Sequence, residues 1–195
     1  ASHGGRSQRS DETYGKTYGS AVSPTNCGSG GNFSSENFTY AGGGAVKIIV
    51  GGTMLVDGEI NADAAWAQYY TGSGGSIWLD ADALTGSGSI HANGGNCSSY
   101  GMGAGGRISV TVRGASDLSA FAGKMEAYGG FLCNAQGVVS GYSEGTPGTV
   151  YVKTAADQPN GGTLTVASKD GIFKPRTPAK AMTVVPAELL CDDVT

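Results

Sequence analysis

A glycine pair followed by alternating apolar residues occurs three times in the sequence. The pairs are Gly43-Gly44, Gly74-Gly75 and Gly105-Gly106, and successive pairs are 31 residues apart. After each pair every second residue is apolar, as in the stretch AVKIIV of the first copy. Such alternation is typical of β-strands that bury one face. A copy of this size buries too little apolar surface to fold alone, so the copies are expected to pack on one another.

Each copy continues through a short middle segment into a second alternating stretch, centred on Ile60, Ile90 and Met125. A weaker fourth copy is expected between Gly148 and Val166. Three short strands per copy, separated by glycines, predict an all-β fold: a right-handed parallel β-helix, a solenoid with coils of about 30 residues. In it, glycines would supply positive φ angles at the turns and let the coils stack closely.

A β-sandwich is the alternative architecture, because its strands also recur every 8–12 residues with turn signals between them. The domain organisation predicted for the solenoid has three parts. Residues 1–40 form an irregular N-terminal cap or a degenerate first coil, residues 41–168 form the coils, and residues 169–195 form an extended, proline-containing C-terminal arm or linker.

Composition excludes several classes of protein. The 35 glycines follow no three-residue period, which argues against collagen, and the 39% of apolar residues fall in alternating blocks, which argues against disorder. A net charge of −4 predicts no nucleic-acid partner. No apolar run approaches the length of a membrane span. Without an initiator Met or a signal peptide, the chain is expected to be a mature or excised piece.

The cysteines and the N-glycosylation sequons both favour a secreted protein. The four cysteines, none in a CxxC pair, lie mostly in glycine- and serine-rich stretches and are predicted to form disulfides, with all three pairings open. They are Cys27, Cys97, Cys133 and Cys191. Sequons at Asn32, Asn37 and Asn96 all fall in predicted loops. We therefore expect an extracellular or cell-surface glycoprotein with no metal and no cofactor.

The opening SHGGR, the repeats from GGGAVKIIV to GAGGRISV, and the closing GTVYV carry a resemblance to a known family. Over about residues 1–153 the chain resembles the glycine-rich β-helix repeats of large secreted, adhesin-like proteins of bacteria and protists. The resemblance implies a parallel β-helix and a role in surface, matrix or filament structure. It carries no catalytic residues to this chain.

Residues that could support enzymatic chemistry have ordinary explanations. Asp80 and Asp82 lie on one face of a predicted strand and could bind Ca²⁺ or serve a glycosidase. The aligned copies place no acidic residues above or below them, which favours a solvated outer face. A β-helix polysaccharide lyase or hydrolase would need a base, for which the candidates are Lys47, Arg107 and Arg113. His3 and His91 are expected to make structural or surface contacts, so we expect no enzyme.

Aromatic residues are the remaining candidates for binding. Trp66, Tyr69 and Tyr70 cluster between two copies, where they could pack on the solenoid, contact a protein or stack on sugars. Trp78 alternates with two core positions and is predicted to point outward, towards a partner outside the core.

The expected function is structural. The chain is predicted to be a disulfide-stapled building block of an extracellular filament, matrix or cell-surface appendage, which associates with itself, head to tail, or with neighbouring domains. A carbohydrate-binding adhesin module with a glycan partner is the first alternative, and the polysaccharide lyase or hydrolase is the second.

Overall fold

The computed structural model describes residues 3–4, 16–31, 40–98, 101–133 and 139–169 of the chain. This part contains twelve strands and no helix. It therefore offers no helical segment with the length and apolarity needed to cross a membrane. Side chains of residues 139–144 lie outside the description.

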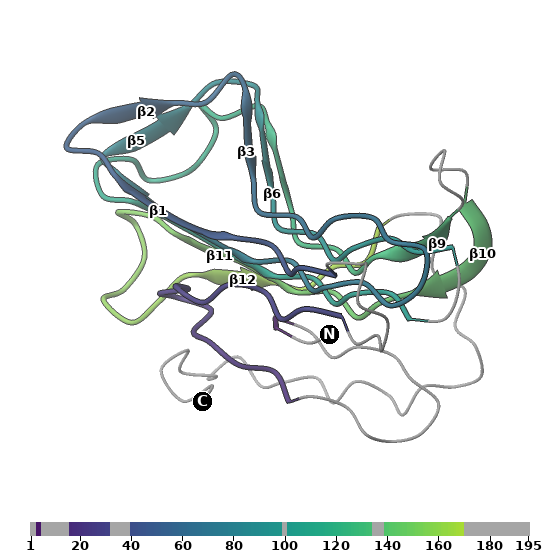
Figure 1. The fold of residues 1–195 in the computed structure, drawn as a ribbon. Helices are drawn as coiled ribbons and strands as arrows, with labels where there is room; N and C mark the ends of the chain where they lie inside the picture. Colours follow the sequence, from purple (N-terminus) through teal and green to yellow (C-terminus); the bar gives the residue numbers. More distant parts are fainter. Residues whose placement is uncertain (1–2, 5–15, 32–39, 99–100, 134–138, 170–195) are drawn as a thin grey trace.

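The first strand of each copy joins one five-stranded sheet, with the order β1-β4-β7-β11-β12 (Figure 1). Its strands are β1 (Ala45–Ile49), β4 (Ser76–Ala81), β7 (Arg107–Val112), β11 (Thr149–Lys153) and β12 (Thr163–Thr165). All neighbours run parallel except β12, which is antiparallel to β11. Val46 pairs with Ile77, and Ile77 with Ile108. The alignment of copies by their glycine pairs is therefore confirmed.

The second and third strands of each copy form two smaller parallel sheets. The two-stranded sheet consists of β2 (Thr53–Leu55) and β5 (Ala83–Thr85), and the three-stranded sheet consists of β3 (Glu59–Asn61), β6 (Ser89–His91) and β8 (Lys124–Glu126). In the three-stranded sheet, Ile60 pairs with Ile90 and Ile90 with Met125. The second alternating stretch of each copy is thus also a strand in the expected register.

An antiparallel hairpin interrupts the repeat after the third copy. It joins β9 (Phe131–Cys133) to β10 (Val139–Glu144). In Figure 1 this hairpin lies at the opposite end of the molecule from β2 and β5.

The prediction of a right-handed parallel β-helix is wrong, and so is the alternative of a β-sandwich. The sheets are rich in parallel pairs, but residues 3–4, 16–31, 40–98, 101–133 and 139–169 form no closed solenoid, and only 35% of them lie in strands. The two-stranded sheet ends after two copies, and the five-stranded sheet ends in the reversed strand β12. The physical reason is that the copies are unequal: the third replaces its middle strand by a single bridge at Phe121, and the hairpin follows it.

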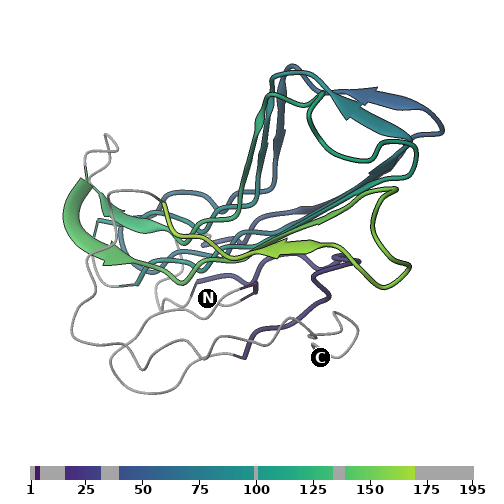
Figure 2. The same ribbon diagram turned by 180° about the vertical axis from the view of Figure 1, so that it is seen from behind.

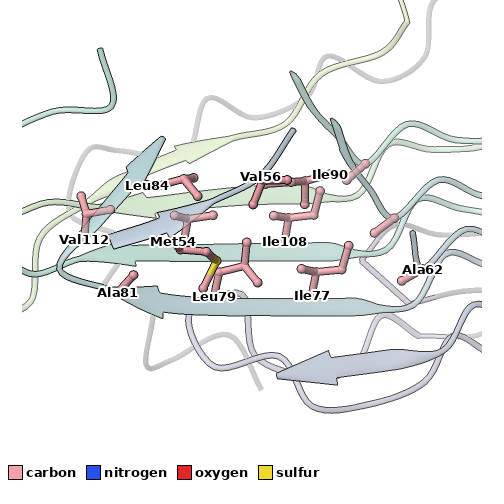
Figure 3. Packing of buried hydrophobic residues seen from close by; sticks show 13 residues of the cluster. Met54, Val56, Ala62, Ile77, Leu79, Ala81, Leu84, Ile90, Ile108 and Val112 are labelled. Carbon is pink, nitrogen blue, oxygen red and sulfur yellow. The ribbon is translucent and has the colours of Figure 1, made fainter. Parts of the chain in front are cut away.

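The apolar core fills the angle between the five-stranded sheet and the two smaller sheets (Figure 3). Ile77, Leu79 and Ile108 point inward from the large sheet and are at most 1% exposed. Met54, Leu84 and Ile90 meet them from the smaller sheets. The inward residues are the ones that the alternating pattern selects, which is why the strands form in this register.

Outside the strands, glycine-rich segments hold the copies together by backbone hydrogen bonds. Between neighbouring copies, Gly43 N–H donates to Ser73 C=O and Gly74 N–H to Ala104 C=O, both at 2.9 Å. A second set closes each copy on the start of the next, with donors Gly75, Gly106 and Gly148 and acceptors Ala62, Ala92 and Ala127 at 2.7–2.8 Å. These segments therefore replace strand pairing where the solenoid was expected to continue.

The glycines serve close approach more than backbone conformation. Of the described glycines, Gly19, Gly86 and Gly162 have positive φ. At Gly75, by contrast, an added Cβ would lie 1.8 Å from the carbonyl oxygen of Gly44. Positive φ at a turn is thus confirmed at Gly86, and the close stacking expected of the glycines is confirmed at the repeated pairs, where two backbones touch.

Residues 16–31 run along the outer face of the five-stranded sheet, on the side away from the core (Figure 2). Their backbone carbonyls accept hydrogen bonds from that face: Ser76 Oγ donates to Asn26 and Ser109 Oγ to Val22, both at 2.6 Å. The described part of the predicted cap thus lies on a sheet face. The predicted C-terminal arm, 169–195, lies outside the described residues after Lys169.

Candidate functional site

The N-terminal segment is fixed by two buried titratable side chains. His3 is fully buried, and its Nδ1 lies 2.9 Å from the Gly74 carbonyl oxygen. Arg107 is 2% exposed and donates from Nε to the Tyr18 carbonyl at 3.0 Å and from Nη1 to Thr149 Oγ1 at 3.4 Å. Burial lowers the pKa of both side chains. Arg107, a candidate base at the sequence level, is therefore a structural residue.

Arg113 clamps the three copies together at the end of their first strands. It forms ion pairs with Asp80 and Asp82 of the second copy, the latter at 3.0 Å from Nη2. It also donates from Nη2 to the Val50 carbonyl of the first copy at 2.8 Å. The two aspartates that suggested calcium or glycosidase chemistry are thus bridged by a guanidinium, as expected for a solvated outer face.

The outer face of the three-stranded sheet carries a second polar cluster. His91 Nδ1 lies 3.5 Å from Glu59 Oε1 and 3.9 Å from Asp63 Oδ2. Burial raises the pKa of Asp63. Hydrogen bonds from Asn93 and the interaction with His91 lower this pKa, but their effect is smaller. In the part of the chain that the structure describes, no three His, Cys, Asp or Glu side chains are arranged to hold a metal ion.

Trp78 points outward as predicted, and its contact is the neighbouring strand. The Lys47 ammonium lies 3.4 Å from the centre of the indole ring, and the two residues are register partners of β1 and β4. This cation–π pair covers part of the ring.

The aromatic residues Trp66, Tyr69 and Tyr70, between the first and second copies, differ in how far they are exposed. Trp66 is 44% exposed. The nearby Cys133 thiol is buried, and burial raises its pKa. Tyr69 and Tyr70 are partly buried. The Tyr70 ring lies against Gly101, where an added Cβ would meet Cδ1 at 2.7 Å. Only Trp66 of this cluster offers a large exposed ring.

The described cysteines form no disulfide with one another. Cys27 is exposed, whereas Cys97 and Cys133 are buried, which corrects their assignment to polar loops. Cys97 is bridged to Leu132, so alternation along β9 turns the Cys133 side chain to the opposite face. Two such thiols cannot join without backbone movement. Cys191 lies outside the described residues.

Of the three sequons, only Asn96 lies in the described part; Asn32 and Asn37 fall outside it. The Asn96 side-chain oxygen accepts the Phe131 backbone N–H at 2.9 Å. Asn93 does the same for Tyr128 N–H at 2.7 Å. These asparagines supply carbonyl groups to the third copy, a structural role that the sequon pattern does not reveal.

In the described part of the chain, the strands of the first copy stand at the unpaired edge of the five-stranded sheet and of both smaller sheets. β1, β2 and β3 each stand at the end of their sheet order. Ser76 donates to the Gly44 carbonyl, and Val50 donates to the Asp80 carbonyl. Because alternate residues of a strand face opposite neighbours, the backbone N–H of Lys47 points to the free side. We call β1, β2 and β3 together the first-copy edge.

The apolar residues behind the first-copy edge are less covered than their counterparts in the next copy. Val46, Ile48 and Ile60 are partly exposed, while their register partners in the second copy are buried. Ile49 and Leu55, on the outer faces of β1 and β2, are 62% and 67% exposed. The first-copy edge is therefore a surface on which further strands would bury apolar area.

No protein-family model, curated protein or solved structure shows significant similarity to the chain.

Proposed function

We propose that the chain is a structural building block of an extracellular filament, matrix or cell-surface appendage, and that it associates through the first-copy edge. The observation that carries this proposal is that β1, β2 and β3 are all terminal strands of parallel sheets. Unpaired backbone groups on a strand edge are a template for another chain. A head-to-tail contact of this kind does not close on itself and so gives open assemblies.

The extracellular setting of the proposal comes from the sequence. It rests on the sequons at Asn32, Asn37 and Asn96 and on the resemblance to repeats of secreted adhesin-like proteins. A scaffold role is also supported by the contacts of the candidate catalytic bases, because each of them makes a structural contact. Lys47 packs on Trp78, Arg107 holds the N-terminal segment, and Arg113 bridges two aspartates. We therefore propose no enzymatic activity.

Lys47→Pro is expected to abolish assembly while leaving the folded chain intact. Proline removes the one backbone N–H of Lys47, which faces away from β4, so no existing ladder hydrogen bond is lost. Sedimentation velocity and negative-stain imaging of the full chain would measure assembly, and a urea unfolding curve would measure stability.

Lys47→Ala is the matched control, because it removes the same contact with Trp78 but keeps the N–H. The alanine variant should assemble like the unmodified chain. Equal assembly of the proline and alanine variants would show that the β1 edge is not the contact.

A carbohydrate-binding module remains a second candidate, favoured by one observation. The Trp66 ring is 44% exposed, and it is the large exposed ring of the segment between the first and second copies. An exposed aromatic face is suited to stacking on a sugar ring. On a glycan array, binding by the unmodified chain and its loss, by tenfold or more, in Trp66→Ala is the expected result. Trp78→Ala is the control, and an array without any binding would dismiss this candidate.

A further inference from the structure

The segment that contains β12 has the residue pattern of the third strand in the earlier copies. Each version has a glycine, a polar residue, a large apolar residue, a polar residue and a smaller apolar residue. The four versions are GEINA, GSIHA, GKMEA and GTLTV, beginning at Gly58, Gly88, Gly123 and Gly162. The first three lie in the three-stranded sheet, as β3, β6 and β8. By its pattern, β12 is the fourth strand of that sheet.

The spacing within the fourth copy agrees with that assignment. Fourteen residues separate the start of β1 at Ala45 from the start of β3 at Glu59. Fourteen residues likewise separate the start of β11 at Thr149 from the start of β12 at Thr163. The connection after β11 is therefore as long as the one that carries the first copy from the five-stranded to the three-stranded sheet.

Among the described residues, no strand occupies the place that a fourth strand would take. The far edge of β8 has no strand partner among the described residues. Beside it lies a cavity of about 200 Å³, lined by Met125, Ala127 and Val150 on the core side and by Thr165 and Ala167 of the β12 segment. Meanwhile Leu164 and Val166 are 36% and 43% exposed. The segment thus exposes its apolar residues Leu164 and Val166, while its Thr165 and Ala167 line the cavity beside Met125.

A turn holds β12 in its observed position. Asp157 Oδ2 accepts hydrogen bonds from the Thr154 backbone N–H at 2.8 Å and from its hydroxyl at 2.9 Å. The Tyr151 hydroxyl donates to the Gly161 carbonyl at 2.6 Å. Because β12 is antiparallel to β11, it covers the edge on which a parallel strand would otherwise add.

We propose that β12 exchanges between β11 and β8, and that its transfer to β8 opens the surface that receives the first-copy edge of a second copy of this chain. The proposal rests on the proposed function, and it identifies the surface, at β11 and β12, to which the first-copy edge of another molecule binds. β7 and β8 belong to the same copy. With β12 on β11, the five-stranded sheet continues for two strands beyond β7, whereas the three-stranded sheet ends at β8. A second molecule could then add strands to only one of the two sheets. With β12 on β8, both sheets end together.

The pairing that follows continues the existing ladders. β1 of the second copy adds to β11, and its β3 adds to β12. Continuing the register, Ile60 of the second copy meets Leu164, which extends the line of Ile60, Ile90 and Met125 already present within one chain. The small polar Thr163 and Thr165 receive the polar neighbours Glu59 and Asn61 of the second copy. No like charges are opposed in this register.

Two double-cysteine variants of the full chain, each with Cys27→Ser and Cys191→Ser, separate the two positions of β12. Val152→Cys with Thr163→Cys joins register partners of the observed hairpin and locks it when oxidised. Met125→Cys with Leu164→Cys places the two thiols at register partners when β12 lies on β8. The readouts are the intramolecular disulfide, by mass spectrometry of the monomer, and assembly, by sedimentation.

The hairpin-locked variant should assemble at least tenfold less than the same variant after reduction, and the Met125–Leu164 pair should form its disulfide and then assemble at least as well as the unmodified chain. Undiminished assembly of the locked hairpin would overturn the exchange and leave the proposed function standing. Absence of the Met125–Leu164 disulfide under assembling conditions would overturn it as well. Formation of that disulfide in a chain that never assembles would instead retain the exchange and refute the proposed function.

Discussion

Gly75→Ala is expected to destabilise the chain by about 3 kcal/mol or more, because the new methyl group would overlap a backbone that cannot turn aside. The added Cβ would lie 1.8 Å from the Gly44 carbonyl oxygen and 2.6 Å from the backbone of Gly43. A side chain could rotate away from such a contact, but here the two copies must separate. The separation would also break the 2.8 Å hydrogen bond from Gly75 N–H to the Ala62 carbonyl. The shift in the urea midpoint measures the effect.

Gly51→Ala is the matched control for this variant. An added Cβ at Gly51 meets nothing within 4 Å, and its φ is not positive. The same chemical change should therefore alter stability by no more than about 0.5 kcal/mol. Similar midpoints for the two alanine variants would mean that the glycine segments do not hold the copies as closely as the structure shows.

Ile77→Ala is expected to cost about 2–5 kcal/mol, because Ile77 is fully buried at the centre of the core and its register partners, Val46 and Ile108, cannot fill the space. The free energy of unfolding from urea denaturation measures this loss. Ile49→Ala removes the same atoms from a side chain that is 62% exposed in the adjacent strand, and should cost less than about 1 kcal/mol. Equal losses would contradict the assignment of inner and outer faces in the five-stranded sheet.

The strand register was predictable because two local signals agree. Alternating apolar residues define which side of each strand is buried, and the glycine pairs fix the offset between copies. Together they place Ile77 between Val46 and Ile108, as the structure does. The Lys47–Trp78 contact could have been predicted in the same way, since the two residues are aligned in the repeat.

The closed solenoid was not correctly predicted, because closure depends on what the unequal segments between strands do. Nothing local in GTLTV indicates that Thr163 will pair antiparallel with Val152 and leave β8 uncovered. The residue pattern of β12 favours a place beside β8, but a hydrogen-bonded turn at Asp157 directs the strand back onto β11. The pattern favoured one sheet, and the turn holds the strand on the other.

The candidate site was predictable only in part. The outward position of Trp78 and the solvated face at Asp80 follow from alternation. The burial of Cys97 and Cys133 does not, because their glycine-rich surroundings look like loops until neighbouring copies pack on them. The buried contacts of Arg107 with the N-terminal segment join residues 89 positions apart, for which a sequence carries no local signal.

The hydrogen bonds of Asn93 and Asn96 with backbone N–H groups of the third copy show how copies of different length can be joined. The offset between paired residues is 30 from Ile60 to Ile90 but 35 from Ile90 to Met125, and the ladder continues through both. The side-chain oxygens of Asn93 and Asn96 accept the backbone N–H groups of Tyr128 and Phe131 in the longer third copy. Among the first three copies, each passes to the next the same parallel edge in the five-stranded and three-stranded sheets. In these two ladders a copy could therefore grow longer by insertion between its strands without a change in the contacts between neighbouring strands.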